Sequence, residues 1–394
     1  MPQSLSIQIS KIRYTNTMIK ALYLHVPFCK TICHYCDFKR SVYQKEIVDK
    51  WLKAIERDLL RKNINPFLQT IYIGGGTPTA LSNQQLEHLL MLLKPYTTGI
   101  EEYTIESNLE SITIEKMALL QRYGVNRISL GVQSYDDTLL AYMNRNHMVV
   151  EIKEKIALVH KYIKNISVDL IYGFQAQTIE IWKTTLQQVI QDPYIQHVSI
   201  YSLTIEPGSI FHQKGIQTIE NQIEARMYEV GKEILESAGF HQYEIANYAK
   251  TKKESLHNQI YWHYEDFYGI GVGASGKEHH QRYSIIGSVN DYILDNATQE
   301  LEKLSIKDEI IEFLMMNFRL INGFDIQRFE SLFQLTLFKT FPKTIKKIQA
   351  MGYVKSIDSC LQLNEQGFLL LHDILVLFME ELDERENITT QSNL

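Results

Sequence analysis

Short runs of β-type apolar residues recur roughly every thirty residues along the first half of this chain, and stretches with helical periodicity separate them. Such alternation is typical of βαβ units, whose strands form a parallel sheet. The pattern alone fits either a barrel or a doubly wound sheet. The six expected strands cover residues 21–26, 70–73, 103–105, 127–132, 167–171 and 197–203.

The helical stretches between these strands have apolar residues at a spacing of three and four, as helices that pack on a sheet require. A chain of 394 residues is too long for one small core, so we expect a large α/β domain followed by an appendage. The clearest helices in the first half are expected over residues 48–60, 86–93, 114–120 and 152–162.

Three of the four cysteines, Cys29, Cys33 and Cys36, fall within eight residues. Three thiolates on one loop suit a soft metal centre, since sulfur ligands select zinc, copper(I) or iron–sulfur clusters. Structural zinc wants four ligands, and His25 or His34 is available as the fourth. A [4Fe–4S] cluster also usually takes four cysteines, so three would leave one iron open to a small molecule.

The residues around the cysteines, YLHVPFC at 23–29 and CDF at 36–38, resemble the radical-SAM family of oxygen-independent coproporphyrinogen-III oxidases and their haem-chaperone relatives. The resemblance covers nearly the whole chain. It implies an α/β fold, namely a partial (β/α)6 TIM-like radical-SAM barrel with a small C-terminal helical, winged-helix-like domain. It also implies that Cys29, Cys33 and Cys36 hold a [4Fe–4S] cluster, that S-adenosylmethionine (SAM) occupies the open iron, and that an electron donor reduces the cluster.

The expected second strand ends in the sequence GGGTPT at residues 74–79. A lone glycine run usually marks a tight turn, but glycines also let the backbone approach a ligand closely. The resemblance implies the second role, in which the backbone around Gly75, Gly76 and Thr77 holds the methionine amino group of SAM.

Polar residues also follow the other expected strands, at the edge where barrel enzymes carry their chemistry. Taken singly, each of them reads as a structural hydrogen-bonding group. The resemblance instead implies contacts with the carboxylate, ribose and adenine of SAM, and it adds two tyrosines near the cysteines. The residues implied in these contacts are Glu106, Gln133, Arg145, Asp169, Tyr23 and Tyr35.

A second constellation, HNxxYW, begins at His257. Without context, these residues describe an exposed turn that leads to a packed tryptophan. The string also resembles a signature of the haem-chaperone branch, in which the histidine is implicated in haem binding; imidazole is a common axial ligand of haem iron. The glycine-rich stretch 269–276 does not open a βαβ unit, so it does not predict a dinucleotide site; we expect a loop near the barrel mouth.

The composition changes near residue 305, and we divide the chain accordingly. We expect a flexible N-terminal extension (1–17), a radical-SAM barrel with the HNxxYW segment (18–300), the C-terminal domain (301–380) and a polar, fraying tail (381–394). Met18 is a candidate for the true start of the chain. Cys360 lies in an expected β-hairpin of the C-terminal domain and is interpreted as a small core or surface residue.

Charge and cysteine usage limit the class of partner and the compartment. The formal net charge of −6 gives no basic patch for nucleic acid. No apolar run reaches the length of a transmembrane helix. Four cysteines, three of them clustered, do not form a disulfide framework, so we expect a reducing compartment, the cytoplasm.

Two departures from the oxidase pattern favour the haem-chaperone branch. The oxidases carry a further cysteine two residues after the third cluster cysteine, where this chain has Phe38, and they have a longer N-terminal segment. We therefore expect a protein that binds haem, through His257, and passes it to an acceptor protein. Whether the chain is an enzyme stays open. The alternatives are an oxygen-independent coproporphyrinogen-III oxidase and, from another class, a zinc-binding structural or interaction protein.

Overall fold

The structure, a computed structural model, describes residues 18–391. Six parallel strands in sequence order form the centre of a nine-stranded sheet, each pairing with the next. All six predicted strands are confirmed, most of them extended by a few residues. They are β1 (Ala21–Val26), β4 (Thr70–Gly75), β5 (Glu102–Asn108), β6 (Arg127–Gln133), β7 (Asn165–Tyr172) and β8 (Ile195–Ser202).

Three short strands extend this sheet at its two edges. β11 (Tyr268–Ile270) pairs in parallel with β1, whereas β10 (Asn247–Ala249) and β9 (His241–Gln242) continue antiparallel from β8. β11 and β9 are the outermost strands and do not pair with each other. The sheet is therefore an open, partial barrel, as predicted.

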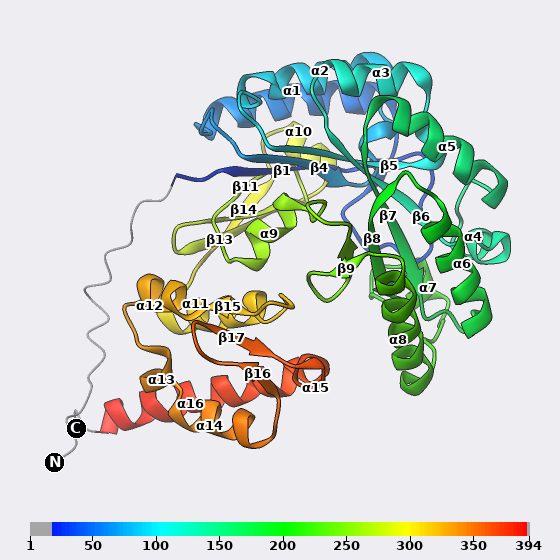
Figure 1. Cartoon of the computed structure of the whole chain (residues 1–394). Coiled ribbons are helices and arrows are strands. Elements are labelled where there is room, and N and C mark those ends of the chain that lie inside the picture. The colour runs from blue at the N-terminus through cyan, green and yellow to red at the C-terminus, as the bar shows by residue number, and fades with distance from the viewer. Residues whose placement is uncertain (1–17, 392–394) are drawn as a thin grey trace.

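Helices cover the outer face of the sheet (Figure 1). Alternate residues of each strand, such as Ile71 and Ile73 of β4, are fully buried against them, which stabilises the fold by about 1.5–3 kcal/mol for each large side chain. The covering helices are α1 (Lys45–Arg61), α2 (Asn83–Leu93), α3 (Ile114–Arg122), α5 (Val149–Tyr162), α6 (Ile179–Gln191) and α8 (Asn221–Ser237), with the shorter α4 (Asp137–Tyr142) and α7 (Ile210–Gln213).

A small antiparallel sheet follows the barrel strands and was not predicted. Its strands run in the order β12, β13, β14, and the short helices α9 and α10 lie before and within it. Every residue of β14 is exposed, so this strand has no apolar alternation to reveal it. The bounds are α9 (Leu256–Trp262), β12 (Ser275–Glu278), β13 (Gln281–Ile286), α10 (Val289–Ile293) and β14 (Thr298–Lys303).

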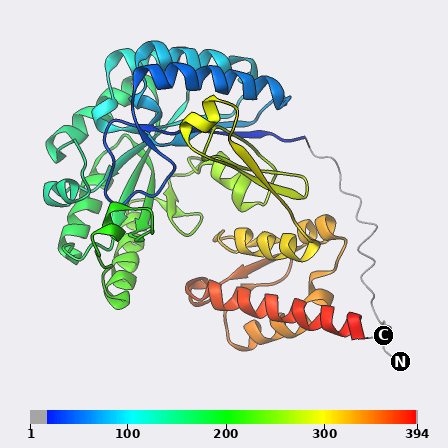
Figure 2. The ribbon, with the colours of Figure 1, turned by 180° about the vertical axis from the view of Figure 1, so that it is seen from behind.

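The C-terminal domain has its own core of packed phenylalanines, separate from that of the barrel, and Figure 2 shows it as a distinct unit. Its helices surround a three-stranded sheet of order β15, β17, β16, so the predicted hairpin gains a third strand. The elements are α11 (Ile306–Asn317), β15 (Phe324–Asp325), α12 (Ile326–Phe333), α13 (Leu337–Thr340), α14 (Pro342–Ala350), β16 (Val354–Ser356), β17 (Cys360–Leu363), α15 (Glu365–Leu369) and α16 (Leu371–Gln391).

Two predicted domain boundaries fall inside elements. The boundary at 300 lies within β14, and the boundary at 380 lies within α16. Leu382 is buried in the domain core, and the Glu381 carboxylate accepts hydrogen bonds from the backbone N–H groups of Lys343 and Thr344, at 3.0 and 2.7 Å. Residues 381 and 382 thus belong to the domain. The expected extension 1–17 lies outside the described residues. No helix within 18–391 is long and apolar enough to cross a membrane.

Candidate functional site

The cysteine loop leaves the carboxyl end of β1, beside the ends of the neighbouring strands. A parallel pair, β2 (Phe28–Cys29) and β3 (Ser41–Val42), closes the base of the loop. Cys29 is buried, whereas Cys33 and Cys36 are partly exposed. The loop is therefore fixed at its root and accessible at its tip.

The segment after β6 holds the tip of this loop in place. The His34 N–H donates to the Met143 carbonyl at 3.1 Å, and the Asn144 side-chain amide donates to the Ile32 carbonyl at 2.8 Å. These bonds join parts of the chain more than a hundred residues apart. Because they anchor backbone atoms between the cysteines, they set the position of the loop relative to the strand ends.

Two side chains donate hydrogen bonds to cysteine sulfurs. The Thr77 hydroxyl lies 3.5 Å from Cys29 Sγ, and Arg145 Nη1 lies 3.3 Å from Cys33 Sγ. Asn108 joins the two donors, since its amide donates to Thr77 Oγ1 at 3.0 Å and its oxygen accepts from Arg145 Nη2 at 2.9 Å. The predicted SAM residues Thr77 and Arg145 thus lie against the cysteine loop.

Burial favours the protonated form of two of the three thiols, Cys29 and Cys36. It raises the pKa of Cys29 to about 11, against the lowering effect of the Thr77 hydrogen bond, and it also raises the pKa of Cys36. Charges on Cys33 and Cys36 act on Cys29, so the three sulfurs lie within electrostatic reach of one another. Metal binding at these thiols would release protons, because the thiolate is the ligand.

The ligand set itself stays a prediction. Within residues 18–391, no group of three His, Cys, Asp or Glu side chains is already arranged around a metal position. His25 is almost fully buried, with Nδ1 3.0 Å from the Tyr23 hydroxyl and Nε2 2.8 Å from the Lys39 carbonyl oxygen. Both ring nitrogens are engaged, so His25 offers no free nitrogen as a fourth zinc ligand.

The glycine run at the end of β4, residues 74–76, is required by close packing of the chain on itself. Gly75 has φ +107°, and a Cβ there would lie 2.5 Å from the His25 ring. A Cβ at Gly76 would lie 2.8 Å from the Phe28 carbonyl oxygen. A side chain at either position would push the run away from β1 and the cysteine loop, so these glycines bring the two segments together.

Glu106 lies on the inner face of the sheet, next to the glycine run. Its carboxylate accepts hydrogen bonds from the Tyr72 hydroxyl at 2.8 Å and from the Gly75 N–H at 3.0 Å. Burial raises the pKa of Glu106 from its ordinary 4.5 to about 7. The negative charge of Asp169 adds to this rise, whereas the two hydrogen bonds oppose it. The Tyr23 ring contacts the Tyr72 ring, with centroids 6.1 Å apart.

The remaining predicted SAM residues share this inner face or lie at its rim. Gln133 is buried with φ +69°, at an irregularity in the pairing of β6 with β7, so its backbone is strained. The Ser129 hydroxyl contacts both carboxylate oxygens of Asp169, at 3.0 and 3.2 Å. Tyr35 packs beside Arg145, with a pKa raised by burial and by the nearby Cys33.

His257 lies elsewhere, inside the barrel near the amino ends of the strands. Its side chain is completely buried, with Nδ1 2.8 Å from Thr70 Oγ1 and Nε2 2.7 Å from the Tyr261 hydroxyl. The ring stacks on Tyr72 at 5.2 Å, and burial lowers its pKa to about 3. Both nitrogens of a neutral imidazole are therefore occupied by partners within the protein.

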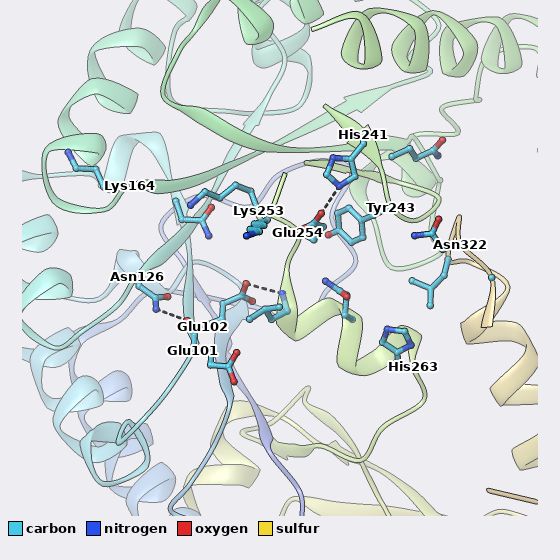
Figure 3. Close-up of a pocket in the computed structure, with 17 residues that line it drawn as sticks. Glu101, Glu102, Asn126, Lys164, His241, Tyr243, Lys253, Glu254, His263 and Asn322 are labelled. Carbon is cyan, nitrogen blue, oxygen red and sulfur yellow. Dashed lines mark hydrogen bonds and ion pairs between the residues drawn. The ribbon is translucent and has the colours of Figure 1, made fainter. Parts of the chain in front are cut away.

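The rest of the HNxxYW helix, α9, faces other parts of the molecule. Trp262 lies toward the C-terminal domain, where the Arg319 guanidinium sits 4.6 Å from the centre of its ring. Gln259 and His263 line a cavity of about 930 Å³ at the amino edge of the barrel sheet (Figure 3). The helix thus presents three different surfaces within two turns.

Three residues of this architecture had no role in the sequence-based predictions. Asn108 links the two sulfur donors, Tyr72 links His257 to Glu106, and buried Glu102 accepts hydrogen bonds from the backbone N–H groups of Leu256 and His257 at the start of α9. Tyr72 lies within a predicted strand, and Asn108 lies just beyond the next predicted strand. A polar residue near a strand end was therefore the one sequence signal that could have identified them. Nothing in the sequence pairs Glu102 with a helix about 150 residues later.

Two family profiles match this chain. Residues 23–189 match the Radical SAM superfamily, and residues 304–370 match the HemN C-terminal domain. The first covers the cysteine loop and the first five strands of the barrel; the second covers most of the C-terminal domain.

Curated relatives match over nearly the full length. The chain is 34% identical over 381 residues to the haem chaperone HemW of Bacillus subtilis, covering 92% of this chain and 100% of the relative. It is 32% identical over 367 residues to HemW of Lactococcus lactis, covering 91% and 96%. Among solved structures, Escherichia coli coproporphyrinogen III oxidase, HemN, matches with a TM-score of 0.78 at 20% identity, covering 94% and 92%. The last match shows a shared fold.

Proposed function

Because this chain belongs to the HemW family of radical-SAM haem chaperones, we propose that it binds haem and transfers it to an acceptor protein. The observation that carries this proposal is the identity of 34% with a haem chaperone over that protein's entire length. The match covers both the barrel and the C-terminal domain.

Family membership implies a [4Fe–4S] cluster and SAM. We propose that Cys29, Cys33 and Cys36 hold the cluster, since they share one loop and two of their sulfurs already receive hydrogen bonds. When bound, such a cluster supplies one-electron chemistry toward SAM, and it requires an electron donor. Thr77 and Arg145 would stabilise negative charge on the sulfurs.

The SAM residues are proposed on their placement along the carboxyl edge of the sheet. Gly75, Gly76 and Thr77 lie at the end of β4 and just after it, and Glu106 already accepts a hydrogen bond from the Gly75 N–H. Arg145 carries a buried Nε atom with no hydrogen-bond partner among the described residues, in a position to pair with an anionic group. The other proposed SAM contacts are Tyr23, Tyr35, Gln133 and Asp169.

A second candidate function, coproporphyrinogen-III oxidation, is favoured by the structural likeness to HemN over 94% of this chain. Phe38 stands against it, because it occupies the position of a further cysteine in the oxidases and its side chain is largely exposed. The two functions differ in their products, which makes them separable in one preparation.

We also propose that His257 ligates the haem iron, which requires a local rearrangement of its side chain. The ring would first have to leave Thr70 or Tyr261, since both nitrogens are engaged. Location in the cytoplasm stays a prediction from cysteine usage.

The test uses one anaerobically reconstituted preparation in two parallel assays. In the first, hemin is titrated and the Soret band is followed; we expect saturation near one haem per chain. In the second, coproporphyrinogen III is supplied with SAM and a reductant; we expect no decarboxylated product. Decarboxylation without saturable haem uptake would replace the chaperone with the oxidase.

A further inference from the structure

The segment that carries the cysteines continues into an exposed surface with an excess of positive charge. Residues 30–45 hold four lysine or arginine side chains and a single acidic one, Asp37, whereas the whole chain has a formal net charge of −6. Two large apolar side chains of the same segment are exposed beside these cations. We call this surface the loop patch; it comprises Lys30, Phe38, Lys39, Arg40, Val42 and Lys45.

We propose that the loop patch is the docking surface for the electron donor of the cluster, and that this donor is a small acidic protein with a flavin as its redox centre. The inference rests on the proposed function, in which Cys29, Cys33 and Cys36 hold a cluster that needs one electron at a time. It gives a role to surface residues that the SAM and haem proposals leave unused.

The positive charges of the loop patch are available to a partner. Its three lysines are exposed and Arg40 is partly exposed. Among the residues that the structure describes, no ion pair engages any of these four cations, not even with the exposed Asp37. Arg40 Nη1 donates to the Phe38 carbonyl at 2.8 Å, which holds the guanidinium on the loop. Charges that no carboxylate of the chain neutralises create a positive potential, which attracts an acidic protein.

Exposed apolar side chains make the loop patch a contact surface as well as a charged one. Phe38 is 61% exposed and Val42 is 55% exposed, and in the sequence each lies between cationic residues. Protein interfaces often centre on an aromatic side chain, with a polar rim around it. The Phe38 ring offers a flat face to the edge of a planar flavin, which favours a flavoprotein over a donor with an iron–sulfur centre.

Backbone pairing holds the loop patch in a fixed shape at the root of the cysteine loop. β2 and β3 pair in parallel, with Cys29 opposite Val42. The Tyr43 N–H donates to the Cys29 carbonyl at 2.8 Å, and the Ser41 N–H makes a bond of 2.7 Å to the carbonyl of Pro27. A partner that docks here therefore meets a surface whose position relative to the cysteines is set.

The loop patch also lies close to the sulfurs, as electron transfer requires. Phe38 follows Cys36 by two residues, so their Cα atoms are at most about 7 Å apart. Cys33 and Cys36 are themselves partly exposed. A flavin held over Phe38 would therefore be near the cluster.

The proposed transfer moves one electron and no atoms. The electron leaves the anionic flavin hydroquinone, which becomes the neutral semiquinone, and it enters the cluster. No proton moves, and no bond forms or breaks. Encounters of this kind are weak and bury less than about 1,200 Å², so the charges act mainly on the rate of encounter and on its dependence on salt.

The first test measures binding, with oxidised flavodoxin, a small acidic flavoprotein, as the probe. It is titrated calorimetrically into the full-length reconstituted chain at several salt concentrations. We expect Lys39→Glu/Lys45→Glu to weaken binding at least about five-fold at low salt and to flatten its salt dependence. Phe38→Ala should weaken binding but keep the salt dependence. The matched control, Lys346→Glu/Lys347→Glu, makes the same change of charge at exposed lysines of α14 and should bind as the wild type does.

The second test measures reduction of the cluster, which separates docking from the properties of the cluster itself. Its visible absorption is followed by stopped flow after mixing with reduced flavodoxin or with dithionite, a small reductant that needs no docking surface. We expect the two patch variants to be reduced more slowly than the wild type by flavodoxin, and at the wild-type rate by dithionite. Slow reduction by both reductants, or unchanged flavodoxin binding in the patch variants, would overturn the docking surface.

Failure of the proposed function gives a different result. A wild type that takes up no haem, but binds flavodoxin with the expected salt dependence, overturns the chaperone and keeps the docking surface. Saturable haem uptake by a wild type that binds flavodoxin no more tightly than Lys39→Glu/Lys45→Glu does the reverse. Tighter binding of an acidic ferredoxin than of flavodoxin would overturn the assignment of a flavin donor.

Discussion

The side chains that donate hydrogen bonds to the cysteine sulfurs come from segments that are far apart in the sequence. Thr77 follows β4 and Arg145 follows β6, and Asn108 at the end of β5 holds both. The cysteine spacing is visible in the sequence, but this support is not, because it depends on the order of strands in the sheet. Hydrogen bonds to the sulfurs are among the factors that set the reduction potential of an iron–sulfur centre.

Substitution of the cysteines tests the proposed ligand set. We expect Cys29→Ala, Cys33→Ala and Cys36→Ala each to lose most of the iron and sulfide bound after anaerobic reconstitution, together with the cluster's visible absorption. Cys360→Ala is the control, since Cys360 lies on β17 in the C-terminal domain and should leave the iron content unchanged. A cysteine-loop variant with full iron content would contradict the assignment.

The raised pKa of Glu106 predicts a pH-dependent stability of the apoprotein. An acid whose pKa is higher in the folded state stabilises the fold at low pH, and this contribution is lost as the pH rises through the folded value. A rise from 4.5 to about 7 corresponds to at most about 3 kcal/mol of unfolding free energy. Wild-type stability should therefore fall between about pH 4.5 and pH 7 relative to Glu106→Gln, between the ordinary and the raised pKa.

Urea unfolding at several pH values measures this difference. The comparison with Glu106→Gln isolates this carboxyl from the other titratable groups nearby, above all Asp169, whose pKa is also raised by burial. Parallel pH profiles for the two proteins would show that Glu106 keeps an ordinary pKa, and would remove it as a proton-sensitive part of the SAM site.

At the scale of elements, α9 shows where sequence reasoning stops. A seven-residue helix with polar and aromatic residues on every side has no dominant apolar stripe, so its orientation is set by tertiary contacts. The histidine of the motif was expected to face a ligand, yet the structure buries it between Thr70 and Tyr261. Spacing places His263 on a different face, and only the fold reveals the cavity there.

The glycine run at the end of β4 gives a prediction at this scale. Gly75→Ala should destabilise the protein by about 2–5 kcal/mol, because a left-handed backbone costs about 1–2 kcal/mol and the clash with His25 adds about 1–3. Gly124→Ala is the matched control: its φ is +85° but nothing lies within 4 Å, so about 1–2 kcal/mol is expected.

Denaturant unfolding of the two variants gives the comparison directly. Equal losses would mean that the approach of the run to His25 is looser than the structure indicates. SAM affinity of reconstituted Gly75→Ala should fall as well, whereas Gly124→Ala, which lies just after α3, should bind normally.

At the scale of the molecule, the alternation of strands and helices predicted the barrel well, because buried parallel strands are apolar throughout and their periodicity is strong. The exposed meander of β12 to β14 and the true extent of α16 were missed for the opposite reason. Their residues are polar, and their positions depend on packing between segments such as Glu381 and the start of α14. The sequence pattern also did not predict the two edge strands, β11 and β9, between which the barrel stays open.

The proposed haem ligand and the cysteine loop lie at different ends of the barrel, since His257 is buried beside Thr70 at the start of β4. We expect His257→Ala to bind hemin at least ten-fold more weakly than the wild type while it keeps its full iron–sulfur content. Cys33→Ala should show the reverse: it loses the cluster but binds hemin within about three-fold of the wild type. Loss of both cluster and haem in each variant would instead indicate one shared site.

The central claim is that this chain carries haem in order to give it away. The most direct measurement is transfer: the anaerobically reconstituted protein is loaded with one equivalent of hemin and mixed with excess apomyoglobin, and the Soret band is followed. The account predicts that the haem leaves completely, at a rate set by its release from this chain. Haem that stays on the chain in the presence of excess acceptor would contradict a chaperone and indicate a permanent haem protein.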